Sequence, residues 1–241
     1  MIRIFSLLYF YLFLGFYVIA QTSKIDAIDG YVAFDAVVGI ENTGLSQGLL
    51  YSEKYRTINE NKQFFKSSNF ENGNIWYKGQ PYYEKYLKYD AHHDQVLVQV
   101  QSQATGQQAT LQLFKSDVDS FDLLKHRFVQ LKFPKENQIL KAGFYESLYQ
   151  NNDLRLFVRH SKNKVELKGG SFVYYEFPDL KKQYSLFYDE KFYSLNSKKD
   201  ILEAFKINKK ELNILYKKLK RKYKDQNRFM VELVKQIGST A

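Results

Sequence analysis

The sequence Gln-Val-Leu-Val-Gln-Val-Gln at residues 95–101 is the clearest structural signal in the chain. Val96, Val98 and Val100 recur at every second position and alternate with glutamines. Successive side chains of a β-strand point to opposite faces of the sheet, so this spacing gathers the three valines on one face. The stretch therefore predicts a half-buried strand with Val98 in the core.

The segments on both sides of this strand show the same period. Residues 82–89 place Tyr83, Leu87 and Tyr89 on one face, and residues 109–113 alternate apolar residues with Gln and Thr. Short polar links join the three segments. Consecutive strands with short links pair in an antiparallel fashion, and such sheets commonly leave one face in water. We therefore expect an antiparallel meander with one wet face.

Further strands are expected on both sides of this meander. Residues 128–133 predict a strand that groups Val129, Leu131 and Phe133 on one face. Later segments predict strands and hairpins at 144–149, 154–160, 171–177 and 184–195, with turns at 151–153 and 189–191. Residues 21–70, which glycines interrupt, predict short strands and turns. The fold class is mainly β, as an antiparallel meander, a sandwich or an open barrel.

From Ser197 onward the apolar period becomes helical. Residues Ser197 to Asp200 and Asn208 to Glu211 have the form of capping boxes, in which a short polar side chain and a carboxylate satisfy free amides at a helix start. Apolar residues then recur three and four positions apart as far as Gly238, which suits a helix C-terminal cap. We expect two or three short helices in this tail.

The first twenty residues have the parts of a secretory signal peptide. Arg3 precedes a run of 16 apolar residues from Ile4 to Ile19, and Ala20 follows. A membrane-spanning helix needs about 20 such residues. We expect cleavage after Ala20, no transmembrane span in the mature protein, and a location in the periplasm or at the cell surface. The domain organisation expected is a signal peptide at 1–20, a β-rich body at 21–196 and a basic helical tail at 197–241.

Composition narrows the setting of the protein. The chain has 241 residues, no cysteine and 17% aromatic residues. The lack of cysteine excludes thiolate catalysis and disulfides and favours a bacterial envelope over an extracellular eukaryotic setting. Residues 21–180 carry 19 basic and 19 acidic side chains, whereas residues 181–241 carry 16 and 7. The net charge of +10 therefore lies almost wholly in the C-terminal quarter.

Three motifs have the outline of a site, and each lacks a required part. His92-His93-Asp94 offers two adjacent imidazoles, whereas zinc needs three or four ligands from separate elements. Residues 117–122 place Phe121 and Asp122 where a calcium loop needs a ligand and a glycine. The glycine-spaced stretch 39–44 lacks the lysine of a phosphate loop. We expect no catalytic, cofactor-binding or metal-binding residue, and no cofactor.

The basic run in the tail is the strongest candidate for contact with a partner. Its charge would suit an acidic envelope protein or an anionic surface, whereas export disfavours nucleic acid. A solvated helix face whose apolar side packs on the body is nevertheless the first interpretation, an acidic surface partner is the second and lipid is the third. The candidate patch consists of Lys217, Lys218, Lys220, Arg221, Lys222 and Lys224.

A set of short motifs resembles secreted proteins of Bacteroidota to which no activity is assigned. The resemblance spans nearly the whole chain after residue 20 and implies an exported setting without implying any catalytic residue. The motifs that carry it are Gly39-Ile-Glu-Asn, Tyr55-Arg-Thr-Ile-Asn, Gln63-Phe-Phe, Phe70-x-x-Gly73, Trp76-Tyr-Lys-Gly-Gln-Pro-Tyr, Leu87-Lys-Tyr-Asp and Ser197-Lys-Lys-Asp.

These observations lead to one main hypothesis and two alternatives. The main hypothesis is a non-catalytic exported protein with a binding or structural role. The first alternative is a carrier that holds an apolar, lipid-like ligand against a curved sheet. The second is a hydrolase that uses a pair of carboxylates, which 26 acidic residues neither reveal nor rule out.

Overall fold

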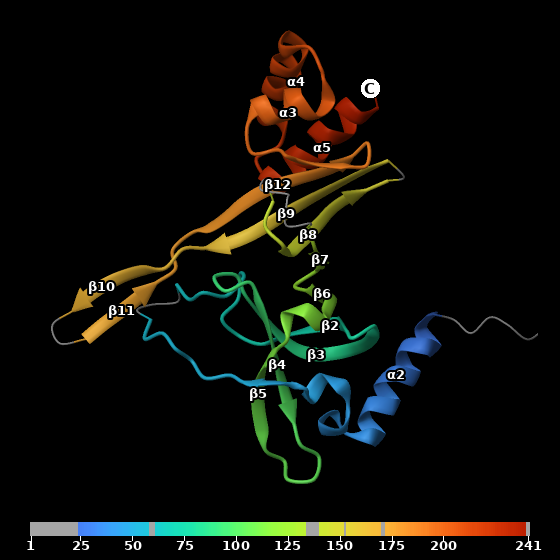
Figure 1. Cartoon of the computed structure of the whole chain (residues 1–241), viewed down its shortest axis with the longest axis vertical. Coiled ribbons are helices and arrows are strands. Elements are labelled where there is room, and N and C mark those ends of the chain that lie inside the picture. The colour runs from blue at the N-terminus through green and yellow to red at the C-terminus, as the bar shows by residue number, and fades with distance from the viewer. Residues whose placement is uncertain (1–23, 58–60, 134–139, 152, 170–171, 240–241) are drawn as a thin grey trace, which may run out of the picture.

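The computed structural model describes residues 24–57, 61–133, 140–151, 153–169 and 172–239. Its described part contains thirteen β-strands and four α-helices, and it confirms a mainly antiparallel β fold with helices at the C-terminus. The molecule is elongated (Figure 1), with the C-terminal helices at one end and helix α2 (Lys24–Val38) toward the other. The expected signal peptide at 1–20 lies outside the described residues.

Eleven strands form one antiparallel sheet in the order β1-β5-β4-β3-β2-β6-β7-β8-β9-β12-β13. The remaining two strands, β10 and β11, form a hairpin that projects sideways from the sheet (Figure 1). The strands are β1 Gly48–Leu50, β2 Glu71–Tyr77, β3 Gln80–Asp90, β4 Gln95–Gln101, β5 Gln108–Leu113, β6 Val118–Leu123, β7 His126–Leu131, β8 Gly143–Gln150, β9 Leu154–Lys162, β10 Val165–Gly169, β11 Phe172–Glu176, β12 Leu180–Tyr188 and β13 Lys191–Ser194.

The valine-rich stretch forms β4, which pairs antiparallel with β3 and β5 as the meander required. Val96 and Val98 are fully buried in one core, and Val100 packs against it. The opposite face is not uniformly wet, because Leu97 is also buried. Leu97 lies beside Tyr51 and Tyr55 of the segment that follows β1, so this segment covers part of the second face.

Strict alternation in β3 was a wrong expectation. Tyr82 is buried in the same core as Leu87 and Tyr89, although odd and even positions of a regular strand face opposite ways. The register between β2 and β3 shifts between Gly73 and Ile75, and Glu84 has a positive φ of 55°. A β-bulge adds one residue to a strand and so reverses which face the later side chains occupy.

The buried face of β7 is not the one that carries its branched residues. Phe128, not Val129, lies fully in the core, where its ring stacks on Phe121 with centroids 4.6 Å apart. Strand β7 ends at Leu131, so Phe133 lies beyond it and contacts Tyr145 instead. An aromatic ring on one face and branched residues on the other make the buried face ambiguous from the local pattern alone.

The expectation of only short strands and turns in residues 21–70 was wrong for α2. Its apolar residues occur around the whole helix, so the sequence shows no helical stripe. Helix α2 packs along β3, where Tyr31 meets Tyr83 at 5.9 Å between ring centroids and Asp35 forms an ion pair with Lys85 at 2.9 Å. Strand β1 and two 3₁₀ turns do follow the helix, as the glycines indicated.

The tail folds into α3 (Lys198–Phe205), α4 (Lys209–Lys222) and α5 (Gln226–Gly238), which together we call the helical cap. Ser197 and Asp200 form the expected capping box. Asn208 caps α4 by accepting from the amide of Lys210, so the second box is not of the expected form. Gly238 belongs to α5, which Ser239 caps, and the glycine allows close approach to Leu154.

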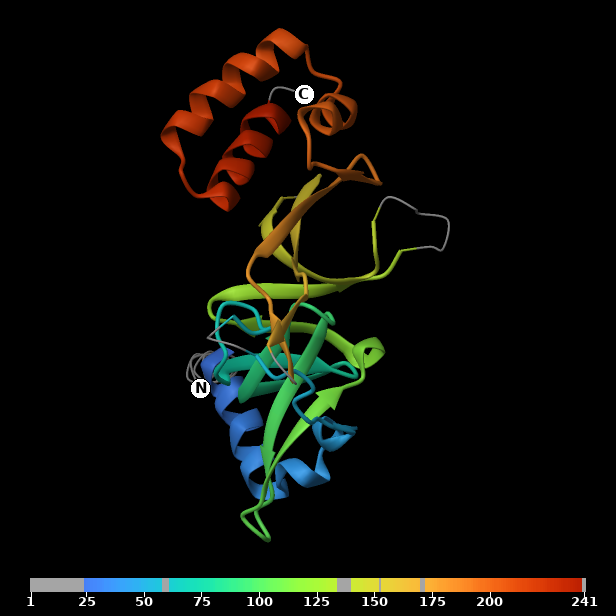
Figure 2. The same ribbon diagram turned by 90° about the vertical axis from the view of Figure 1, so that its left-hand side faces the viewer.

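Two hydrophobic cores hold the molecule together. The first lies on the side of the sheet built from β2 to β7. The second joins the helical cap to β9 and β12 through residues such as Leu156, Leu186 and Leu233, which are fully buried. Figure 2 shows the cap seated over this end of the sheet. The tail is therefore a packed part of the fold.

Candidate functional site

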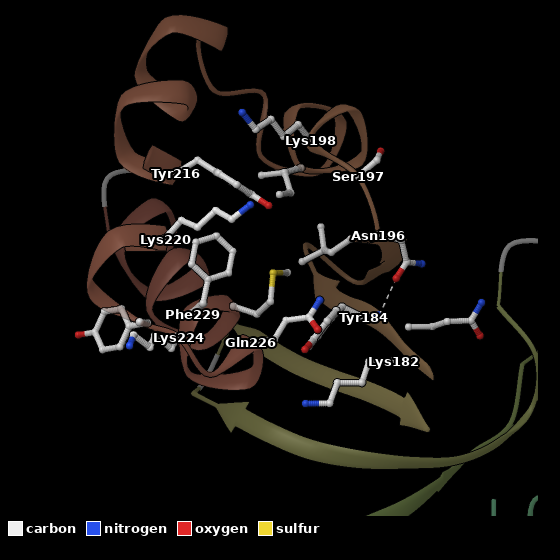
Figure 3. A pocket seen from close by; sticks show the side chains of 15 residues that line it. Lys182, Tyr184, Asn196, Ser197, Lys198, Tyr216, Lys220, Lys224, Gln226 and Phe229 are labelled. Carbon is white, nitrogen blue, oxygen red and sulfur yellow. Dashed lines mark hydrogen bonds between the residues drawn. The ribbon is translucent and has the colours of Figure 1, made fainter. Parts of the chain in front are cut away.

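A cavity of about 530 Å³ lies where the helical cap meets β12 (Figure 3). Strand β12, the residues after β13 and all three cap helices contribute to its wall. The side chains that line it are Lys182, Gln183, Tyr184, Leu195, Asn196, Ser197, Lys198, Ile201, Tyr216, Lys220, Tyr223, Lys224, Gln226, Phe229 and Met230.

Four lysines, from one strand, two helices and a link, surround this cavity. Lys182 comes from β12, and Lys198 is the first residue of α3, directly after the Ser197 cap. Lys220 lies in the last turn of α4, and Lys224 lies in the short link to α5. Figure 3 shows Lys220 reaching inward beside Tyr216 and Phe229, with Lys198 and Lys182 on opposite sides of the hollow.

Neutral groups hold two of these lysines in place. The Nζ atom of Lys182 donates to Asn227 Oδ1 at 2.9 Å, and Nζ of Lys198 donates to Asn213 Oδ1 at 2.8 Å. Lys198 also lies over the ring of Tyr216, 4.5 Å from its centroid. Amides and aromatic faces orient an ammonium group without neutralising its charge, so both lysines can still attract an anion.

The floor of the cavity is apolar and rigid. Phe229 and Met230 of α5 are buried, and the Phe229 ring meets Tyr216 edge to face with centroids 4.8 Å apart. Tyr184 is buried between the sheet and the cap, and its hydroxyl donates to Asn227 Oδ1 at 2.9 Å. Its burial, together with the charge of Asp225, raises the pKa of the Tyr184 phenol well above its ordinary value. The phenol therefore acts as a neutral hydrogen-bonding group.

The electrostatics of the cavity favour a negative ligand. Within the part of the chain that the structure describes, its lining includes no acidic side chain. Asp225 lies nearby but caps α5, accepting from the amide of Arg228 at 2.9 Å. Four ammonium groups above an apolar floor attract an anion, and a low-dielectric wall strengthens that attraction. The arrangement suits a ligand with both a negative group and an apolar or ring-shaped part.

The structure divides the basic patch expected from the sequence. Lys220 and Lys224 line the cavity, whereas the other four members are exposed residues of α4 that lie outside its lining. Lys182 and Lys198 were missed, because each belongs only to a Lys-Lys pair outside the basic run, with Lys181 and Lys199 respectively. Only the packing of β12 and α3 against α4 brings them to the same place.

A second cluster that the sequence did not reveal surrounds Glu146 of β8. Nδ1 of His126 lies 2.5 Å from Oε1 of this buried carboxylate, and Nε2 of His160 lies 2.6 Å from Oε2. Lys66 Nζ is 2.6 Å from the other ring nitrogen of His126. The cluster opens on a cavity of about 580 Å³ that shares Lys182 and Tyr223 with the four-lysine cavity.

Burial and hydrogen bonding set the charge states of this cluster. Desolvation raises the pKa of Glu146, but the hydrogen bonds from His160 and His126 outweigh it, and the net pKa is lowered. Desolvation lowers the pKa of His160 in spite of the carboxylate beside it. The favoured state is thus an ionised Glu146 that accepts a hydrogen bond from a neutral His160. This arrangement fixes the two histidines and joins three strands, β7, β8 and β9.

The motifs weighed from the sequence take part in local structure. His93 Nδ1 bonds Asp90 at 2.8 Å and His92 Nδ1 bonds the carbonyl oxygen of Lys162 at 2.9 Å, so both imidazoles belong to the turn before β4. The carboxylates of residues 117–122 bond separate partners, among them Arg127 and the amide of Gly79. Among the described residues, no group of three or more His, Asp or Glu side chains has the geometry to hold a metal ion.

The fold and the cavity together define a β-meander protein with a basic site under a helical cap. Compared with known proteins, the chain matches no family model, no curated protein and no solved structure. No helix in the described part of the chain is both long enough and apolar enough to cross a membrane.

Proposed function

We propose that the protein is an exported, non-catalytic binding protein that holds an anionic ligand in the four-lysine cavity. The observation that carries this proposal is the acid-free lining of the cavity, in which Lys182, Lys198, Lys220 and Lys224 surround an apolar floor. The ligand would place its negative group among the ammonium groups and its ring or apolar part against Tyr216 and Phe229. A carboxylate, sulfate or phosphate bonded to lysines in this way gains charge-assisted hydrogen bonds.

The same observation ranks this function above the two alternatives. A carrier of a purely apolar ligand would have to bury four ammonium groups against hydrocarbon, which is unfavourable. A hydrolase with two carboxylates needs two acidic groups that face each other. The buried carboxylates instead have other partners, namely lysines, an arginine, histidines, a tyrosine and backbone amides. These carboxylates are Asp35, Asp90, Asp94 and Glu146.

The exported setting rests on the sequence. The apolar run before Ala20 and the resemblance to secreted proteins of Bacteroidota both support an envelope or extracellular location. In that setting anionic groups occur on glycans, lipids and acidic envelope proteins. The exposed lysines of α4 outside the cavity would add long-range attraction toward such surfaces.

Binding of a matched pair of small ligands tests the proposal. The purified protein is titrated with 1-naphthyl phosphate and with 1-naphthol, which share the ring but differ in charge, and the heat of binding is measured. We expect saturable binding of the phosphate and much weaker binding of the neutral alcohol. Replacing Lys220 by Gln or Lys198 by Gln should weaken phosphate binding about tenfold each, because each substitution removes a charge-assisted hydrogen bond.

The matched control is Lys217→Gln, which removes the same charge from α4 outside the cavity. Its affinity for 1-naphthyl phosphate should stay within about twofold of the parent protein. If Lys217→Gln and Lys220→Gln lost the same affinity for 1-naphthyl phosphate, binding would depend only on net charge. That result would contradict a site in the cavity. Release of naphthol during the titration would contradict the non-catalytic part of the proposal.

A further inference from the structure

A larger basic cavity adjoins the four-lysine cavity. Its volume is about 970 Å³, and it lies against the other face of β12, where strands β8, β9 and β12 run side by side. The two cavities share four lining residues at the free edge of β12 and its neighbours, namely Lys182, Gln183, Asn196 and Gln226.

This second cavity is also basic and has no acidic side chain in its lining within the described residues. Arg159, Lys162, Lys181 and Lys182 are among its basic residues. Positive charge therefore continues from one face of β12 to the other, around the strand edge. A ligand with one negative group would use only one of the two cavities, whereas a chain of negative groups could use both.

Two buried polar atoms in the second cavity have no hydrogen-bond partner among the described residues. They are Oγ of Ser185, which is 1% exposed, and Nε of Arg159. Arg159 Nη2 donates to Asp94 Oδ2 at 3.2 Å, so this guanidinium is already held in an ion pair while its side chain lines the cavity. Both atoms are closed to solvent, so a ligand in the cavity would meet the other basic, hydroxyl and amide side chains of its lining.

The uncharged side chains of the lining favour one class of polyanion over another. Hydroxyl and amide side chains lie between the basic residues, and Tyr216 and Phe229 offer ring surfaces at the far end. A polyphosphate has no hydroxyl group and no apolar face to use them. An acidic sugar chain has both, together with one negative group per charged unit. The hydroxyl and amide members of the lining are Ser161, Asn163, Gln183, Ser185, Asn196 and Gln226.

We propose that the two cavities form one continuous binding site for a linear acidic oligosaccharide, which bends around the edge of β12 at Lys182. This inference rests on the proposed function, because the four-lysine cavity is one half of the site. Carboxylate or sulfate groups pair with the lysines, and sugar hydroxyls bond Ser161 and the amides. The ring faces of the terminal sugars lie against Tyr216 and Phe229.

The test is the dependence of affinity on ligand length. Oligogalacturonates of one, two, four and six units are titrated into the purified protein, beside a sulfated hexasaccharide and neutral maltohexaose. Affinity should rise at least about tenfold from the monomer to the hexamer, because a longer chain adds charged contacts in the second cavity. The sulfated arm decides whether sulfate or carboxylate is preferred, and maltohexaose should not bind measurably.

Two variants test whether the rise in affinity with ligand length comes from the second cavity. Ser161→Ala removes a partly exposed hydroxyl of the lining, so the melting temperature should change little, yet hexamer affinity should drop several-fold. Lys181→Gln should do the same through lost charge. Both variants should bind 1-naphthyl phosphate as the parent protein does, and Lys217→Gln should change neither ligand.

Each result bears on one of the two proposals. If 1-naphthyl phosphate binds but the hexamer binds no better than the monomer, the oligosaccharide inference fails and the small-anion site stands. Tighter binding of polyphosphate or polyglutamate than of the hexamer would also overturn it, in favour of another polyanion. If neither 1-naphthyl phosphate nor any oligosaccharide binds, both proposals fail.

Discussion

Nε2 of His160 lies 2.6 Å from Oε2 of Glu146, and both residues are almost completely buried. His126 bonds the second oxygen of the same carboxylate. The three residues belong to β9, β8 and β7, so the cluster ties together three neighbouring strands of the sheet. Its titration should therefore control the stability of the whole sheet in acid.

Stability should fall as the pH drops below neutral. The pKa of His160 is lowered by burial, so the unfolded chain binds its proton at a higher pH than the native protein does. The stability contributed by neutral His160 is then complete above about pH 6.5 and is lost as the pH falls toward the native pKa. Glu146, whose pKa is also lowered, adds a second loss below about pH 4.5. Melting temperatures measured from pH 8 to pH 4 check this.

The matched variant for the pH profile is His160→Gln. It keeps a polar group beside Glu146 but cannot titrate, so the decline between pH 7 and pH 5 should become shallower. The variant should also be less stable at pH 7, because the buried carboxylate loses a well-formed hydrogen bond. An unchanged slope would assign the acid sensitivity to other groups.

Strand β4 predicts a sharp contrast between adjacent positions. Val98→Asp should lower the free energy of unfolding by more than about 3 kcal/mol, because it buries an unpaired charge in the first core. Gln99→Asp, at a half-exposed position, should cost less than about 1 kcal/mol. Leu97→Asp should resemble Val98→Asp, since the segment near Tyr55 covers it. Urea denaturation gives all three values, and similar midpoints for Val98→Asp and Gln99→Asp would contradict this register.

Local sequence predicted the parts of the fold that local forces decide. The period of two in β4 and the Ser197 capping box depend on neighbours within a few residues, and both form as expected. The bulge at Glu84 depends instead on a neighbouring strand, because the Glu84 amide donates to Asn74 Oδ1 of β2. Helix α2 was missed because its apolar residues follow no single face, so the pattern carried no helical period.

Two glycines should respond to alanine in opposite directions. Gly30 lies inside α2 with open space where a Cβ would sit, so Gly30→Ala should stabilise the protein by about 0.5–1 kcal/mol through a less flexible unfolded chain. At Gly73 a Cβ would collide with the backbone oxygen of Asp122 on β6. Gly73→Ala should therefore cost about 1–3 kcal/mol. Urea denaturation gives the free energy of unfolding of both variants. A lower free energy of unfolding in both would argue against a helix at residue 30.

The candidate sites could be identified only from the three-dimensional fold. Lys182 and Lys198 are separated by 15 other residues and a β-hairpin, and neither stands out in the sequence. They meet Lys220 only because α4 and α5 pack back over β12. Likewise, His126, Glu146 and His160 show no shared motif, and their contact follows from the antiparallel pairing of β7, β8 and β9. Long-range pairing of strands decides both sites, and a single sequence carries little information about it.

The helical cap and the sheet should unfold as one unit. Leu233 of α5 is fully buried against β9 and β12, so Leu233→Ala should cost about 2–5 kcal/mol, whereas Ile214→Ala on the exposed side of α4 should cost less than about 0.5 kcal/mol. Trp76, the only tryptophan, lies in β2 beside the first core and reports on that part of the sheet, while far-ultraviolet circular dichroism follows the helices. Both signals should shift together in Leu233→Ala, because the eleven-stranded sheet is continuous between the two cores. An unchanged Trp76 transition beside an earlier loss of helix would show a cap that folds and unfolds on its own.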